Sequence, residues 1–116
     1  MHRASTFIAS LSLLASAGTA LAHAQLESAS PAVGSTVRKA PSQVSLSFTQ
    51  KLEKSFSSIE VSGPSGRVDQ GGASVSGARM SVGLKALSPG TYHVHWHALS
   101  VDTHKTEGSF AFTVGK

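Results

Sequence analysis

The sequence predicts an all-β fold, a small β-sandwich or Greek-key barrel. Three observations support this: short stretches in which apolar and polar residues alternate, glycine and proline turn signals between them, and the near absence of helical periodicity. Alternation with a period of two is typical of strands that bury one face in antiparallel sheets. The chain has 116 residues, which fits a single domain.

Five alternating stretches are the clearest predicted strands. They are residues 44–48, 58–61, 80–84, 92–98 and 110–114. Turn-forming residues, such as the Gly-Pro-Ser-Gly at 63–66 and the Ser-Pro-Gly at 88–90, separate them. The Ser- and Gly-rich stretch 62–81 is expected to hold further strands joined by long turns.

Residues 1–22 are predicted to be a secretory signal peptide. A short basic region precedes an apolar run at 7–15, which is too short to span a bilayer, and the stretch ends in the small-x-small cleavage signal Ala-Leu-Ala at 20–22. Cleavage there would leave a mature domain of residues 23–116 that begins with His23 and does not span the membrane.

The composition limits the chemistry that is available. The chain has no cysteine, so it has no disulfide, no thiolate metal ligand and no cysteine nucleophile, and any metal must be bound by nitrogen and oxygen. The formal net charge is +4, and losing Arg3 with the leader makes it +3. The basic residues are scattered and form no basic-aromatic stripe, which indicates no nucleic-acid partner.

Four of the six histidines lie between positions 93 and 104. On a strand over 92–98, alternate side chains face opposite sides, so Tyr92, Val94, Trp96 and Ala98 should face the core, and His93, His95 and His97 should face solvent. Residues two apart on a strand are about 7 Å apart at Cα, so two of these imidazoles could converge on one ion. Exposed polar residues on a sheet are the simpler interpretation, and the role of the three histidines stays open.

A second pattern follows in the segment Ser-Val-Asp-Thr-His at 100–104. Asp102 and His104 are two residues apart and can project toward one side of a loop, although Asp102 could instead cap backbone amides in a plain turn. A histidine with a free α-amine can chelate a metal through that amine and its own Nδ1, which makes His23 a third candidate. Three nitrogens and one oxygen suit the square-planar or tetragonal preference of Cu(II).

Blocks of residues along nearly the whole mature length carry a family resemblance. They are His23-Ala-Gln-Leu26, Ser30-Pro-Ala-Val-Gly34, Pro41, Leu46-Ser-Phe48, Gly90-Thr-Tyr-His-Val-His-Trp96, Ser100-Val-Asp-Thr-His104, Gly108-Ser-Phe110 and Phe112. With these residues the chain resembles the CopC-type periplasmic copper-resistance and copper-binding proteins. The block at 100–104 is the most specific.

The resemblance implies a Greek-key, immunoglobulin-like β-barrel that binds Cu(II) through an N-terminal histidine and an Asp-x-His segment. Carried over residue by residue, the metal ligands are His23, Asp102 and His104. The implied function is periplasmic Cu(II) binding for copper homeostasis or resistance, without catalysis. The copper ion is sequestered or delivered to an inner-membrane importer of the CopD type.

The chain departs from the family pattern at three places. Some members add a Met-rich Cu(I) site, but Met80 is the only methionine here after Met1, so no Cu(I) site is expected. Some members have an acidic residue after the Leu-x-Phe strand, where this chain has Gln50, with Glu53 nearby but out of step. The position after Trp96, often basic in the family, is His97.

Two other classes of function compete with a copper carrier. An N-terminal histidine with a second histidine is also the copper brace of lytic polysaccharide monooxygenases. The short chain and a carboxylate ligand at Asp102, which would fill the open coordination position, argue against that enzyme, because activity must be argued from the site. A plain immunoglobulin-like adhesion module predicts no tight metal binding.

Overall fold

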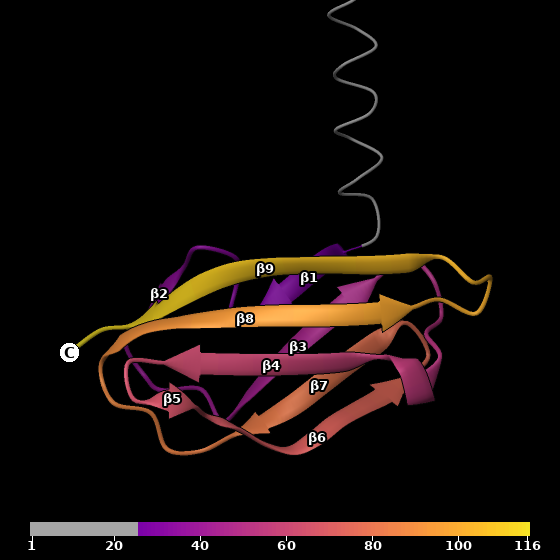
Figure 1. The fold of residues 1–116 in the computed structure, drawn as a ribbon. Helices are drawn as coiled ribbons and strands as arrows, with labels where there is room; N and C mark the ends of the chain where they lie inside the picture. The colour runs from indigo at the N-terminus through magenta and orange to yellow at the C-terminus, as the bar shows by residue number, and fades with distance from the viewer. Residues whose placement is uncertain (1–25) are drawn as a thin grey trace, which may run out of the picture.

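The computed structural model describes residues 26–116, which form two β-sheets packed face to face (Figure 1). The elements are β1 Leu26–Ser30, β2 Thr36–Val37, β3 Gln43–Phe48, the 3-10 turn η1 Lys54–Phe56, β4 Ser58–Gly63, β5 Gly66–Arg67, β6 Asp69–Ser76, β7 Arg79–Leu84, β8 Gly90–Leu99 and β9 Lys105–Val114. Within this part of the chain, no helix has the length and apolar character needed to cross a membrane. The predicted signal peptide and His23 lie outside the described residues.

The two sheets are open and differ in size. One has the strand order β1-β3-β7-β6, and the other has the order β2-β9-β8-β4-β5. Neighbouring strands are antiparallel except for β2, which runs parallel to β9. The predicted all-β class is therefore confirmed, in the form of a sandwich with unclosed sheets.

The core lies between the sheets and follows the alternation in the sequence. All five predicted strands are present, within β3, β4, β7, β8 and β9. On β8 the side chains of Tyr92, Val94, Trp96 and Ala98 are at most 7% exposed, whereas His93 and His97 are exposed and His95 is half-buried. The assignment of the two faces of this strand is thus confirmed, and it places the three histidines on the outer face.

The Ser- and Gly-rich stretch also forms strands. It contains β5, β6 and parts of β4 and β7. The pairing of β6 with β7 shifts register between Gln70 and Ser74. Gly71 and Gly72, inside this irregularity, have φ values of 81° and 69°, a left-handed conformation that glycine adopts without steric cost.

Two segments meet at one end of the sandwich (Figure 1). Residues 100–104 connect β8 to β9 there. The chain that leaves β3 crosses beneath this turn, where Leu52 forms a bridge with Ser100. Strand β1 begins beside the end of β3, because Leu26 pairs with Phe48, the last residue of β3.

Candidate metal site

The segment 100–104 is a tight turn held by its own backbone. The amide of Ser100 donates to the carbonyl of His104 at 3.0 Å, and the amide of Thr103 donates to the carbonyl of Ser100 at 2.9 Å. The amide of Val101 donates to the carbonyl of Lys51 at 2.9 Å, which fixes the turn to the crossing segment after β3. The turn is thus anchored at both ends and along one side.

Thr103 gives the turn its shape. Its φ is 71°, in the left-handed region that β-branched residues rarely adopt, and such strain is found at sites where the surrounding structure enforces it. This reversal brings the two predicted ligands together, with Asp102 Oδ2 3.1 Å from His104 Nδ1. The sequence indicated that these side chains could project toward one side of the loop, and in the structure they lie next to each other.

Ser100 forms hydrogen bonds with both predicted ligands, Asp102 and His104. Its side chain is buried, with 2% of the residue exposed. Its hydroxyl donates to Asp102 Oδ1, and the amide of His104 donates to Ser100 Oγ at 3.2 Å. The Ser100 hydroxyl, more than His104, holds the pKa of the Asp102 carboxyl below its usual value, because a donated hydrogen bond favours the charged form. Sequence analysis did not identify Ser100 as a positioning residue.

The geometry of this pair suits one ion. Two adjacent ligands at about 2.0–2.1 Å from a metal lie about 2.9 Å apart at a right angle, close to the 3.1 Å between Asp102 Oδ2 and His104 Nδ1. Both side chains are solvent-accessible, at 46% and 67%, so an ion can reach them. Two ligands do not complete a coordination sphere, and the third predicted ligand, His23, lies outside the described residues.

Gln50 and Glu53 lie on the crossing segment beside the turn. Gln50 is partly buried, and its Oε1 has no hydrogen-bond partner among residues 26–116. It directly precedes Lys51, whose carbonyl accepts from Val101. Glu53 is exposed and does not cap η1 with its side chain. Of the two, only Gln50 has a buried acceptor on this segment.

Known proteins that are similar to this chain are named as CopC proteins or for copper resistance or copper transport. The CopC domain model matches residues 26–115. The chain is 37% identical to copper resistance protein C of Xanthomonas campestris pv. juglandis, over 96% of this chain and 94% of that protein. It is 34% identical to copper transport protein CutJ of Bacillus subtilis, over 84% of this chain but 19% of that protein. The solved structure of CopC from Methylosinus trichosporium OB3b superposes with a TM-score of 0.73 and 31% identity, covering 80% of this chain and 94% of that one.

Proposed function

Because the chain belongs to the CopC domain family, we propose that it is a periplasmic protein that binds Cu(II) at the turn between β8 and β9. The ligands are the α-amine and Nδ1 of His23, a carboxylate oxygen of Asp102 and an imidazole nitrogen of His104. One observation carries this proposal: Asp102 and His104 adjoin at 3.1 Å on a strained turn, an arrangement that pre-positions a nitrogen and an oxygen for one ion.

The place where β1 begins supports His23 as the remaining ligand. His23 precedes Leu26 by three residues, and a fully extended chain of that length spans at most about 10 Å. Leu26 lines one groove together with Trp96 and with Thr106, two residues after His104. A chain that begins three residues before Leu26 is therefore long enough to extend toward the turn, as a chelate shared with Asp102 and His104 requires.

The proposed role is sequestration of copper or its delivery to a membrane importer of the CopD type, in keeping with relatives that are called copper resistance and copper transport proteins. The site performs no reaction. Two nitrogens from His23, one from His104 and an oxygen from Asp102 fill the four positions that Cu(II) binds most strongly, which leaves no strong open position for oxygen activation. Secretion by a cleaved signal peptide is part of the same proposal.

A titration of Cu(II) into protein that begins at His23 tests the site. Trp96, the only tryptophan, lines the groove beside Leu26, so its fluorescence should respond to copper bound nearby. We expect tight binding of one equivalent in the wild type and loss of that equivalent in His104→Ala. His93→Ala, an exposed histidine on β8, is the matched control and should bind as the wild type does.

Two results would contradict the proposal. If His104→Ala kept the tight equivalent, the copper would be bound elsewhere. If the wild type bound no copper tightly, a secreted β-domain without a metal function would be the better interpretation. Oxygen-dependent cleavage of a polysaccharide by the copper-loaded protein would favour the monooxygenase class instead.

A further inference from the structure

A second group of metal-ligating side chains lies on the outer face of β8 and β9. It consists of His95, His97 and Glu107, whose ligand atoms all lie within 4.8 Å of one another. His95 Nε2 is 3.2 Å from His97 Nε2 and 3.1 Å from Glu107 Oε2, and His97 Nε2 is 3.9 Å from the same oxygen. None of these residues belongs to the turn that holds Asp102 and His104.

The register of two strands brings these side chains together. His97 pairs directly with Glu107, and His95 pairs directly with Ser109. Directly opposed residues on antiparallel strands share a face and have neighbouring Cβ atoms, and residues two apart on one strand share that face too. The cluster therefore rests on regular sheet geometry, which is a more rigid support for a site than a loop.

The three atoms are spaced as the ligands of one ion are. A circle through three points with the separations given above has a radius of about 2.0 Å, which equals a typical metal–nitrogen or metal–carboxylate bond of about 2.0–2.2 Å. A single ion can thus lie at bonding distance from all three atoms without movement of the backbone.

The hydrogen bonds around His95 also favour a cation in this position. His95 Nδ1 lies 2.8 Å from Ser109 Oγ, and when Nδ1 donates to that hydroxyl, the lone pair is on Nε2. The unprotonated forms of Nε2 on both histidines and of the Glu107 carboxylate are all acceptors, so a proton or a metal ion must lie among them. A metal-bound histidine usually has a hydrogen-bond partner on its other ring nitrogen, as His95 has in Ser109.

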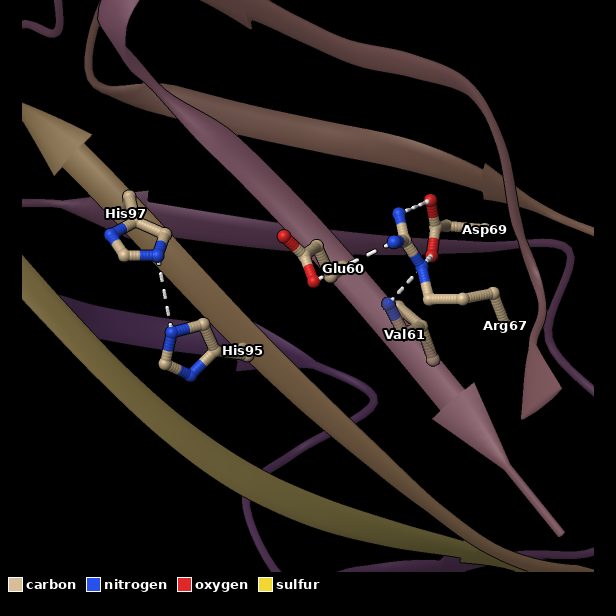
Figure 2. A network of polar contacts seen from close by, with 6 residues as sticks. All are labelled: Glu60, Val61, Arg67, Asp69, His95 and His97. Carbon is tan, nitrogen blue, oxygen red and sulfur yellow. Dashed lines mark hydrogen bonds and ion pairs between the residues drawn. The ribbon is translucent and has the colours of Figure 1, made fainter.

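A fourth possible ligand beside the cluster, an acidic side chain, is already paired. Glu60 on β4 is directly opposite His95, but its carboxylate lies 3.6 Å from the guanidinium of Arg67. Arg67 in turn donates twice to Asp69, at 2.7 Å each. Figure 2 shows this network, with Glu60 on β4, Arg67 on β5 and Asp69 on β6, beside the two imidazoles on β8. The cluster therefore offers three ligands, and the remaining positions of an ion there face solvent.

We propose that His95, His97 and Glu107 form a second divalent-metal site, separate from the turn, that takes Cu(II) or Zn(II). Two imidazoles and one carboxylate are ligands that both ions accept, and Cu(II) binds such sets more strongly than Zn(II). The exposed fractions of the side chains, 39% for His95, 50% for His97 and 57% for Glu107, allow an ion to enter from solvent and leave again. This site does not depend on the assignment of His23, Asp102 and His104.

Binding of Zn(II) is measured by nitrogen NMR of the imidazole side chains, because Zn(II) is diamagnetic. The sample is the exported full-length protein carrying His104→Ala. The His104→Ala substitution disables the turn site. Copper binding at the turn is measured separately, so a failure of one proposed site can be told from a failure of the other. We expect one equivalent of Zn(II) to shift Nε2 of both His95 and His97. Glu107→Gln should weaken this binding at least about tenfold, Ser109→Ala should weaken it about tenfold, and His93→Ala, the exposed histidine on the same strand, should leave it unchanged. Cu(II) should displace the Zn(II).

Either of two results would overturn the second site. In the first, Zn(II) up to millimolar concentration shifts the nitrogen signals of neither imidazole. In the second, the shifts persist at the same Zn(II) concentration in both Glu107→Gln and His97→Ala. Because all three side chains are at least one-third exposed, circular dichroism is expected to show that these variants remain folded. A loss of binding in them therefore reports on the ligands and not on the fold.

Discussion

The indole ring of Trp96 on β8 occupies the space that a side chain at Gly108 on β9 would need. A Cβ built at Gly108 would lie 2.3 Å from Cη2 of the indole and 2.5 Å from Cζ2. The two residues are direct partners across the strands, and the ring is 7% exposed. The absence of a side chain at Gly108 thus leaves room for the indole ring of Trp96 beside β9.

We expect Gly108→Ala to displace the indole. The added methyl overpacks the contact, which should lower the free energy of unfolding by about 1–3 kcal/mol and shift the emission of Trp96. Gly83→Ala is the matched control, because a Cβ there comes no closer than 3.5 Å to another atom, and it should be neutral or slightly stabilising. Equal stability of Gly108→Ala and the wild type would show that the indole ring or the strands can shift to accommodate the methyl group at no cost in free energy.

Ser100→Ala should weaken copper binding although Ser100 is not a ligand. Without the hydroxyl, Asp102 loses a donor and the amide of His104 loses an acceptor, so we expect the affinity for Cu(II) to fall about 10–100-fold and copper-free stability to fall by about 1 kcal/mol. Ser57→Ala is the control, since Ser57 Oγ bonds Glu53 and Leu99 and not the turn ligands. Unchanged affinity in Ser100→Ala would mean that the backbone alone sets the turn.

An extra residue before His23 should delete a ligand. The α-amine would become a peptide nitrogen, and the chelate through the amine and Nδ1 would be lost. We expect weaker Cu(II) binding in protein with one alanine added before His23 than in protein that begins at His23, measured by competition with a chelator. An alanine added after Lys116 serves as the control. Equal affinity of the two N-terminal forms would exclude this chelate.

Acid should release copper from the turn. Imidazole nitrogens and an α-amine bind a metal only when unprotonated, so protons compete with Cu(II) as the pH falls through the histidine range. Equilibrium dialysis at a series of pH values measures this, with circular dichroism to confirm that the protein stays folded. Full retention of copper near about pH 4 would contradict ligation by His23 and His104.

Asp69 should make stability depend on pH in the acidic range. The hydrogen bonds from Arg67, and to a lesser extent the amide of Val61, hold the pKa of the Asp69 carboxyl below its usual value of 3.8 despite burial. A lowered folded-state pKa contributes stability above the unfolded-state value, and this contribution is lost as the pH falls below it. Asp69→Asn should therefore flatten the fall in unfolding free energy between about pH 5 and pH 2.

The control for this prediction is Glu53→Gln, at an exposed carboxylate, which should keep the wild-type slope. Asparagine can still accept from the Val61 amide through its amide oxygen, so Asp69→Asn tests the charge pair with Arg67 alone. The same slope in Asp69→Asn and the wild type would show that this ion pair adds no stability.

Much of the fold could be read from local pattern. Alternation with a period of two identified the strands that carry the core, and it assigned Trp96 to the inside and His97 to the outside, because successive side chains on a strand necessarily face opposite ways. The short strands β2 and β5 carry no such signal, since two residues are too few to show a period. The spacing of Asp102 and His104 likewise allowed both side chains to project toward one side of the chain.

The sequence by itself determined the five strands that carry the core and which face of β8 is buried, because each of these follows from spacing along one segment. The spacing of Asp102 and His104 allowed them to project to one side, but the left-handed backbone at Thr103 brings them together. Only the tertiary structure decided that Glu107 stands beside His97, that Ser100 is buried and bonded to Asp102, and that β1 begins opposite Phe48. These relations join segments through strand register and sheet packing, and register depends on loop lengths and on bulges that no single segment reveals.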